Sequence, residues 1–183
     1  SLFAPKFIEN KLKFFAYIKE AVAFGDGRDG VCAFINIDMD AVGNWAERQN
    51  LAYAGYVDLA CHPRVAELIL GCVETVNADL AKERAFSAAQ VQRFVILHKE
   101  LDPDDDELTR TRKVRRTFIA QKYEVLVDAF YSGKTVQFIE TRVRFEDGRE
   151  GSVSATLTIH PARVIGARES TDDPAPAALR CAA

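Results

Sequence analysis

The sequence lacks the groupings of cysteine and histidine that hold metal ions. Its four cysteines include no Cys-x-x-Cys pair, and its three histidines are scattered among them. Zinc sites need closely spaced pairs of such ligands, so no metal site is expected. The same cysteine usage is typical of a reducing, cytoplasmic compartment. Cys32 and Cys72 lie inside apolar patterns, where each is expected to be a small buried hydrophobe.

Long apolar runs and a strong net charge are also missing. No run approaches the ~18 residues of a membrane span, and residues 1–20 lack the layout of a signal peptide, so a soluble protein is expected. The 24 lysines and arginines are balanced by 27 aspartates and glutamates, for a formal net charge of −3. Nucleic-acid-binding proteins carry a broad basic field, which this balance excludes. Any recognition of anions therefore has to be local.

The sequence contains no convincing nucleotide loop and no catalytic triad. The stretch Gly25-Asp26-Gly27-Arg28-Asp29-Gly30 matches the dinucleotide-binding fingerprint in its glycines alone. That fingerprint functions only where the third glycine opens a helix, whereas a β-rich run follows Gly30. We therefore interpret these glycines as turn formers. Composition singles out no Ser-His-Asp or Cys-His set either, so the chain alone is expected to be inactive.

Hydrophobic periodicity predicts a mixed architecture for the 183 residues. The expected elements are a helix from Pro5 through Ile8, Leu12, Phe15 and Ile18, strands at 21–24, 31–37 and 91–97, a short helix capped by Asp40, a long helix from His62-Pro63 to residue 82, and a helix over 117–131. Alternation between residues 142 and 159 predicts a β-hairpin around Asp147-Gly148. Its covered face would hold Val153, Ala155, Leu157 and Ile159.

These elements predict an α/β (α+β) fold, in which helices pack on a small central β-sheet. We expect the sheet and its helices to occupy residues 1–131, and the hairpin to form an extension over 132–165. Residues 166–183, rich in alanine and proline, are expected to form a loosely held tail.

The most distinctive stretch is Leu-Thr-Arg-Thr-Arg-Lys-Val-Arg-Arg at 108–116. It places five cationic side chains directly behind the acidic run Asp102–Glu107. Such a pattern is typical of solvated surface. It also leaves open a non-enzymatic module that uses the Arg110–Arg116 cluster to bind an acidic partner, such as nucleic acid or anionic lipid.

The order Leu-Thr-x-Thr-x-Lys-Val-x-Arg, followed by Ile119 and Lys122-Tyr123, resembles the last core motif of AMP-forming long-chain acyl-CoA synthetases. These enzymes belong to the adenylate-forming superfamily. Phe3-Ala4-Pro5 and the residues after it resemble the start of their C-terminal domain. Two positions depart from the motif: Arg110 replaces a common proline, and Arg112 replaces a common apolar residue. The resemblance covers residues 2 to about 131 well and the hairpin only loosely.

The resemblance implies that the chain is the C-terminal lid of an enzyme that converts fatty acid, ATP and CoA into acyl-CoA, AMP and pyrophosphate. Lys113 would be the catalytic lysine of adenylate formation, Arg115 and Arg116 would contact phosphate, and Phe3-Ala4-Pro5 would line the CoA channel. An N-terminal AMP-binding domain of the same polypeptide would hold ATP, Mg²⁺ and the acyl chain, and the full-length protein could make peripheral membrane contact. A ligase that loads a carrier protein instead of CoA would share every motif found in this sequence, so this alternative remains.

Overall fold

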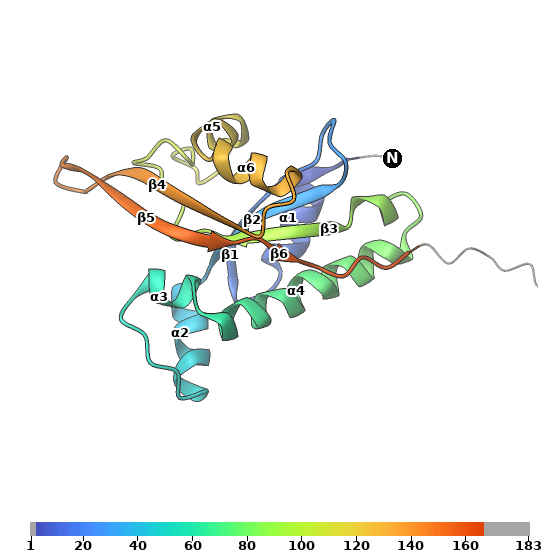
Figure 1. Ribbon diagram of the computed structural model, residues 1–183, viewed down its shortest axis with the longest axis horizontal. Helices are drawn as coiled ribbons and strands as arrows, with labels where there is room; N and C mark the ends of the chain where they lie inside the picture. The colour runs from blue at the N-terminus through green and yellow to red at the C-terminus, as the bar shows by residue number, and fades with distance from the viewer. Residues whose placement is uncertain (1–2, 167–183) are drawn as a thin grey trace, which may run out of the picture.

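The computed structural model describes residues 3–166, and its centre is a four-stranded sheet (Figure 1). The strand order is β1 (Ile18–Phe24), β2 (Val31–Ile37), β3 (Val91–Ile96) and β6 (His160–Pro161). Because β2 and β3 are parallel, both end at the same edge of the sheet, which we call the carboxyl edge. The loop with the basic segment leaves β3 at this edge. The predicted tail lies outside the described residues, apart from Gly166.

The parallel pair requires a crossover, which contains α2 (Met39–Arg48), α3 (Tyr56–Ala60) and the long helix α4 (Pro63–Lys82). His62 caps α4 by accepting a hydrogen bond on Nδ1 from the Arg64 N–H, at 3.0 Å, and Pro63 occupies the first helical turn. The predicted long helix is present, and its apolar stripe, which includes Val65, Ile69, Val73 and Leu80, packs with the sheet in one hydrophobic core. No helix within residues 3–166 is long and apolar enough to cross a membrane.

Alternate side chains of the central strands enter two separate cores. Ala33 and Ile35 of β2 face the first core, together with α1 (Pro5–Lys13) and the crossover helices. Phe34 enters the second core, together with α5 (Arg116–Lys122), α6 (Glu124–Tyr131) and the hairpin. A strand covered on both faces is apolar throughout, which explains the near-continuous hydrophobic runs of β2 and β3. The predicted α/β (α+β) class, with helices packed on a small sheet, is confirmed (Figure 1).

The predicted hairpin is present and is longer than the alternation suggested. β4 (Val136–Arg144) and β5 (Glu150–Thr158) pair antiparallel along their whole length. The four residues predicted to share a face do so: Leu157 and Ile159 are buried, while Val153 and Ala155 are half-buried. The chain then continues directly into β6, which pairs with β3. The hairpin is thereby joined to the central sheet.

The first helix is shorter than predicted. α1 ends at Lys13, and Ile18 is the first residue of β1, where it lies opposite Ile37. The Ile18 N–H donates to the Phe15 carbonyl at 3.1 Å, which closes a turn between helix and strand. Phe15 still packs against the first core from this turn. Helical spacing alone therefore could not locate the end of α1.

Two other helix boundaries also differ from the prediction. Asp38, not Asp40, caps α2, because its Oδ1 accepts a backbone N–H three residues on at 2.9 Å. Asp40 lies in the first turn, where its charge complements the helix dipole. The single helix expected over 117–131 is divided at Tyr123 into α5 and α6. Tyr123 is fully buried in the second core, so the break directs a large side chain inward.

The glycine-rich stretch forms the turn between β1 and β2, as predicted. Gly27 and Gly30 adopt φ angles of +67° and +116°, which side chains disfavour. A Cβ atom on Gly30 would lie 2.4 Å from the Gln92 side chain. Gly27 and Gly30 are therefore needed for the turn geometry.

Candidate functional site

The basic segment forms a short two-stranded arm, which we call the lysine arm (residues 107–115). Its rungs pair Glu107 with Arg115, Leu108 with Val114 and Thr109 with Lys113. The Arg115 N–H donates to the Glu107 carbonyl at 3.0 Å, and the Thr109 N–H donates to the Lys113 carbonyl at 2.8 Å. The arm is therefore rooted at Glu107 and carries Lys113 at its tip.

The turn at the tip is organised by threonine hydroxyls. Thr109 Oγ1 accepts the Lys113 N–H at 3.0 Å and lies 3.0 Å from Thr111 Oγ1. Arg112 takes a left-handed φ of 59°, which reverses the chain within a few residues. Lys113 is exposed, and its ammonium makes no ion pair with any residue from 3 to 166. Its side chain is thus available to an anion from outside this domain.

The two neighbouring arginines are engaged within the domain. Arg115 donates from Nη1 to the Asp106 carbonyl at 2.9 Å, and its guanidinium lies 5.0 Å from the centre of the Phe118 ring. Arg116 forms an ion pair with Glu9 of α1. This pair ties the start of α5 to the first helix. The structure therefore separates Lys113, which faces solvent, from Arg116, which faces inward.

The carboxyl group of Glu9 is nearly buried, with 5% of the residue exposed. Burial raises the pKa of Glu9 from 4.5 to about 7, although the positive charge of Arg116 opposes the shift. Desolvation therefore outweighs the attraction of the arginine at this position.

The predicted CoA-channel residues lie away from the lysine arm. Phe3 packs beside Gly25, in the turn that precedes β2. The lysine arm instead follows the end of β3, which runs parallel to β2. Phe3-Ala4-Pro5 and Lys113 thus occupy opposite ends of the parallel strands, and the structure does not bring them together.

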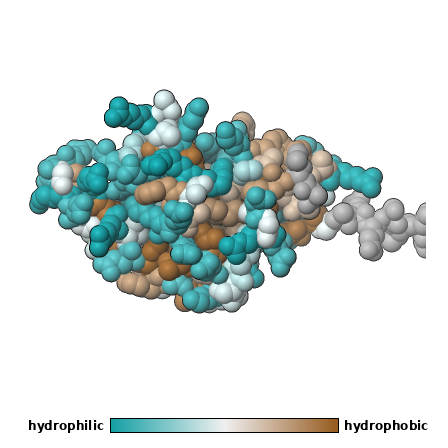
Figure 2. Space-filling view, turned by 90° about the horizontal axis from the view of Figure 1, so that it is seen from above, coloured by the Kyte–Doolittle hydropathy of each residue, from teal (hydrophilic) through white to brown (hydrophobic). Residues whose placement is uncertain are grey.

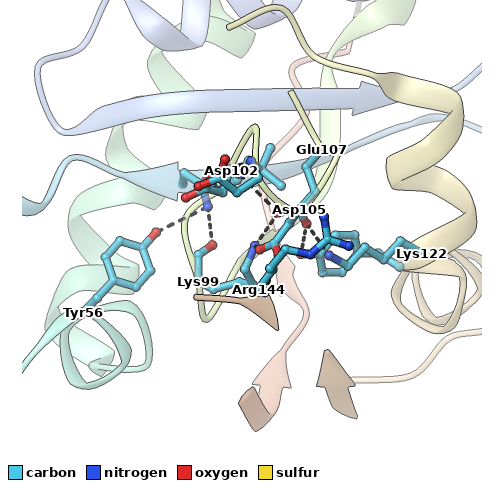
Figure 3. A network of polar contacts seen from close by, with 11 residues as sticks. Tyr56, Lys99, Asp102, Asp105, Glu107, Lys122 and Arg144 are labelled. Carbon is cyan, nitrogen blue, oxygen red and sulfur yellow. Dashed lines mark hydrogen bonds and ion pairs between the residues drawn. The ribbon is translucent and has the colours of Figure 1, made fainter. Parts of the chain in front are cut away.

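A buried charged network supports the root of the lysine arm (Figure 3). Lys99, just after β3, forms ion pairs with Glu107 and, at 2.9 Å, with Asp105. Lys122 of α5 lies 3.3 Å from the Glu107 carboxylate, which also accepts the Tyr123 hydroxyl. Glu107 is 0% exposed. Two ammonium groups therefore balance two carboxylates, as buried charges require.

Asn36 connects the same loop to β2 and α3. Its Nδ2 donates to the Lys99 carbonyl at 2.8 Å and to the Tyr56 hydroxyl at 3.3 Å, and its Oδ1 accepts the Leu101 N–H at 2.8 Å. Burial raises the pKa of Tyr56, so this phenol stays neutral. Sequence reasoning missed Asn36, Lys99 and Glu107. A single amide inside the apolar run of β2 was the one available signal.

A hollow of about 480 Å³ borders the lysine arm, lined by Arg110, Arg115 and Arg144 on one hand and by Asp104 and Asp106 on the other. Hydrophilic residues dominate the end of the molecule that carries the hairpin tip, whereas hydrophobic residues gather toward the other end (Figure 2). The described domain thus offers a cationic arm at an open surface.

Within residues 3–166, no three His, Cys, Asp or Glu side chains form a group that could hold a metal ion.

Comparison with curated proteins links the chain to fatty-acid ligases. It is 32% identical over 130 residues to the long-chain-fatty-acid–CoA ligase FadD15 of Mycobacterium tuberculosis, covering 70% of this chain and 21% of that protein. It is 34% identical over 113 residues to the fatty-acid–CoA ligase FadD11 of the same species, covering 62% of this chain and 19% of that protein. The matched stretch lies in the C-terminal part of these relatives. The chain therefore spans about a fifth of their length.

Comparison with solved structures shows a shared fold. The A-PCP didomain of the carboxylic acid reductase from Segniliparus rugosus, in complex with AMP, matches 71% of this chain with a TM-score of 0.52 and 14% identity; the match covers 16% of that chain. The A domain of a carboxylic acid reductase from the same species, in complex with AMP and a co-purified carboxylic acid, matches with a TM-score of 0.50 and 12% identity, covering 71% of this chain and 18% of that one. No family model matches the sequence.

Proposed function

We propose a function for this chain on the premise that it is a C-terminal domain of the adenylate-forming enzyme family, related to the long-chain fatty-acid–CoA ligases. In this proposal the domain is the lid of a ligase that joins a fatty acid to CoA with the conversion of ATP to AMP and pyrophosphate. The lid supplies Lys113 to the first step, in which the fatty acid carboxylate becomes an acyl-adenylate.

The observation that carries the proposal is the placement of Lys113. It is exposed at the tip of an arm whose root is fixed in the protein interior, and it makes no ion pair among residues 3–166. Lys122, the other lysine near the motif, is paired with the buried Glu107 at 3.3 Å. A mobile ammonium on a fixed base suits a group that must reach an anion held by another domain.

The chemistry of adenylate formation explains why an ammonium is useful there. Negative charge builds on the α-phosphate as the carboxylate attacks and pyrophosphate leaves. A positive side chain placed beside that phosphate in a site from which water is excluded stabilises the transition state more than the ground state. Lys113 would supply this charge, with Arg115 as a weaker candidate because its guanidinium already contacts Asp106 at 2.9 Å.

The remaining parts of the reaction are assigned to the portion of the ligase that this chain does not contain. ATP, Mg²⁺ and the acyl chain would be held mainly by the N-terminal AMP-binding domain. CoA would enter for the second step, and Phe3-Ala4-Pro5 is proposed to border its channel. We place the enzyme in the cytoplasm, which agrees with the free thiols of Cys32, Cys61 and Cys72.

The alternative of a basic module for an acidic partner is weakened by the structure of the cluster. Arg115 is paired with Asp106, and Arg116 is paired with Glu9. Two of the five cations of the sequence are therefore already paired with carboxylates of the domain. Salt-dependent retention of the domain on heparin or duplex DNA would favour that alternative.

Two half-reactions of the full-length ligase test the proposed function. Adenylate formation is measured by fatty-acid-dependent exchange of pyrophosphate into ATP, and thioester formation is measured by supplying acyl-adenylate and CoA. Lys113→Ala should reduce the first rate by at least about 100-fold, since a charge directed at a transition state contributes roughly 3 kcal/mol. It should leave the second rate nearly unchanged, because the lid is proposed to take a second orientation for thioester formation, in which Lys113 lies away from the reacting groups. Lys122→Ala is the comparison. A loss of adenylate formation in Lys122→Ala but not in Lys113→Ala would show that Lys113 is not the catalytic lysine.

A further inference from the structure

We propose that Glu107 is a positioning residue for Lys113: its buried carboxylate fixes the root of the lysine arm and thereby sets where the ammonium lies during adenylate formation. The inference rests on the proposed function and extends it to a residue that has no contact with the reacting groups.

The main chain of Glu107 occupies the root of the arm. Its N–H donates to the Asp102 carbonyl at 3.2 Å, and its carbonyl accepts the Arg115 N–H at 3.0 Å. The first bond closes the acidic loop on one side, and the second begins the ladder that leads to Lys113. Every rung of the arm is therefore built outward from Glu107.

The side chain of Glu107 joins the root to three other parts of the fold. It accepts the Asp102 N–H at 3.2 Å, pairs with Lys99 after β3, and lies 3.3 Å from Lys122 of α5. It also accepts the hydroxyl of Tyr123, at the break between α5 and α6. A carboxylate that is 0% exposed cannot move away from these partners into water without breaking the network.

The acidic loop is held from its other side as well. Asp105 pairs with Lys99 at 2.9 Å and accepts the Arg144 N–H of β4 at 2.7 Å (Figure 3). The central sheet, α5 and the hairpin therefore meet at the base of the lysine arm. Glu107 is the member of this network that belongs to the arm itself.

Lys113 is held in place through the arm, which is fixed by Glu107 at its root, by Leu108 and Val114 in the second core, and by the contact of Arg115 with Asp106. Its backbone is bonded to Thr109 within the arm, and its side chain has no ion-pair partner in the described part of the chain. Misplacing a catalytic group by about 1 Å can cost about 100-fold in rate. A loosened root should therefore affect the step that uses Lys113 and spare the step that does not.

The two half-reactions separate positioning from mere stabilisation. In the full-length ligase, Glu107→Gln keeps the size of the side chain but removes the charge that holds Lys99 and Lys122. We expect adenylate formation to fall about 10- to 100-fold and thioester formation from supplied acyl-adenylate to change less than about threefold. Equal losses in both steps, tracking the folded fraction measured by thermal unfolding, would overturn the inference.

A charge-balanced variant covers the case in which Glu107→Gln folds poorly. Glu107→Met combined with Lys122→Met removes one charge of each sign, fills the space with side chains of similar length, and leaves the Lys99–Asp105 pair intact. Its folding should be better than that of Glu107→Gln, while adenylate formation should remain about 10- to 100-fold low. Recovery of normal adenylate formation in this variant would mean that Glu107 only balances charge, and the inference would be wrong.

Asn77→Asp is the matched control, because it exchanges amide and carboxyl in a fully buried residue near the other end of β3. Asn77 bonds both the Val91 N–H, at 2.7 Å, and the Val91 carbonyl, at 2.8 Å. This variant should lose stability and should lower the rates of both half-reactions equally. If it lowered adenylate formation selectively, a selective loss in the Glu107 variants would no longer indicate a positioning role. Lys113→Ala separates failure of the proposed function from failure of the positioning role of Glu107. If it spares adenylate formation, the proposed function fails. If it abolishes adenylate formation while the Glu107 variants keep the wild-type rate of this step, only the positioning role fails.

Discussion

Replacing Glu9 with glutamine should change how the stability of this domain depends on pH. The carboxyl group is buried against Arg116, and burial raises its pKa from 4.5 to about 7. A raised pKa means that the folded state binds the proton more tightly than the unfolded state does. The stabilisation is therefore complete below about pH 4.5 and is lost as the pH rises through about 7.

The magnitude follows from the two pKa values. The difference between 4.5 and about 7 corresponds to about 3 kcal/mol of unfolding free energy. Most of it should be lost between pH 5 and pH 8, roughly 2 kcal/mol. Glutamine is neutral at every pH and resembles the protonated acid, so Glu9→Gln should not show this loss. The variant should match the wild-type domain at pH 5 and exceed its stability at pH 8.

Urea denaturation at pH 5, 6, 7 and 8 measures the effect as the difference between the two proteins. His98 and His160 have pKa values lowered by burial, which destabilises the fold as the pH falls, but this contribution is common to both proteins and cancels. The exposed Glu47→Gln is a matched control for the loss of one carboxyl group. Parallel curves, or a variant less stable than wild type at pH 8, would refute the reasoning. The ion pair with Arg116 would then outweigh the cost of burying Glu9.

The remaining predictions concern the hairpin and the isolated domain. Leu157→Ala should lower the unfolding free energy by about 2–5 kcal/mol because Leu157 is 3% exposed, whereas Thr156→Ala, on the outer face of β5, should change it by less than about 0.5 kcal/mol; similar effects from both would contradict the assigned hairpin face. The isolated domain should catalyse no ATP–pyrophosphate exchange and should bind ATP no tighter than millimolar, as measured by calorimetry; micromolar affinity would contradict the assignment of the nucleotide pocket to another domain.

The sequence predicts the core of this fold well because its main signals are periodic. The α4 stripe and the apolar runs of β2 and β3 follow directly from helices and strands that bury one or both faces. The boundary errors arise where a local pattern has two solutions. Ile18 fits the helical spacing of α1 yet begins β1, and Asp38 and Asp40 are equally good caps until the direction of the backbone is known.

Only part of the candidate site could be predicted from the sequence. The motif that suggests Lys113 is contiguous, so it can be identified before the fold is known. Glu107 belongs to an acidic run in which Asp102, Asp104 and Asp106 are exposed, and nothing in the one-dimensional charge pattern distinguishes it from them. Its burial depends on Lys99 and on the adjacent residues Lys122 and Tyr123, which converge on it from two other segments of the chain. Tertiary structure, and not local sequence, gives this carboxylate its role.

The two-residue strand β6 also affects how prone the protein is to aggregate while it is being synthesised. It covers the outer edge of β3, and one of its two residues is Pro161, which has no N–H to offer a further strand. An uncovered β3 would present a long apolar edge of the kind that promotes strand pairing between molecules and aggregation. Because β6 follows the entire hairpin, that edge stays open on a nascent chain until the hairpin has emerged and folded. Folding of the hairpin therefore places β6, with its Pro161, on the edge of β3, and this limits pairing of that edge with the sheet of another molecule.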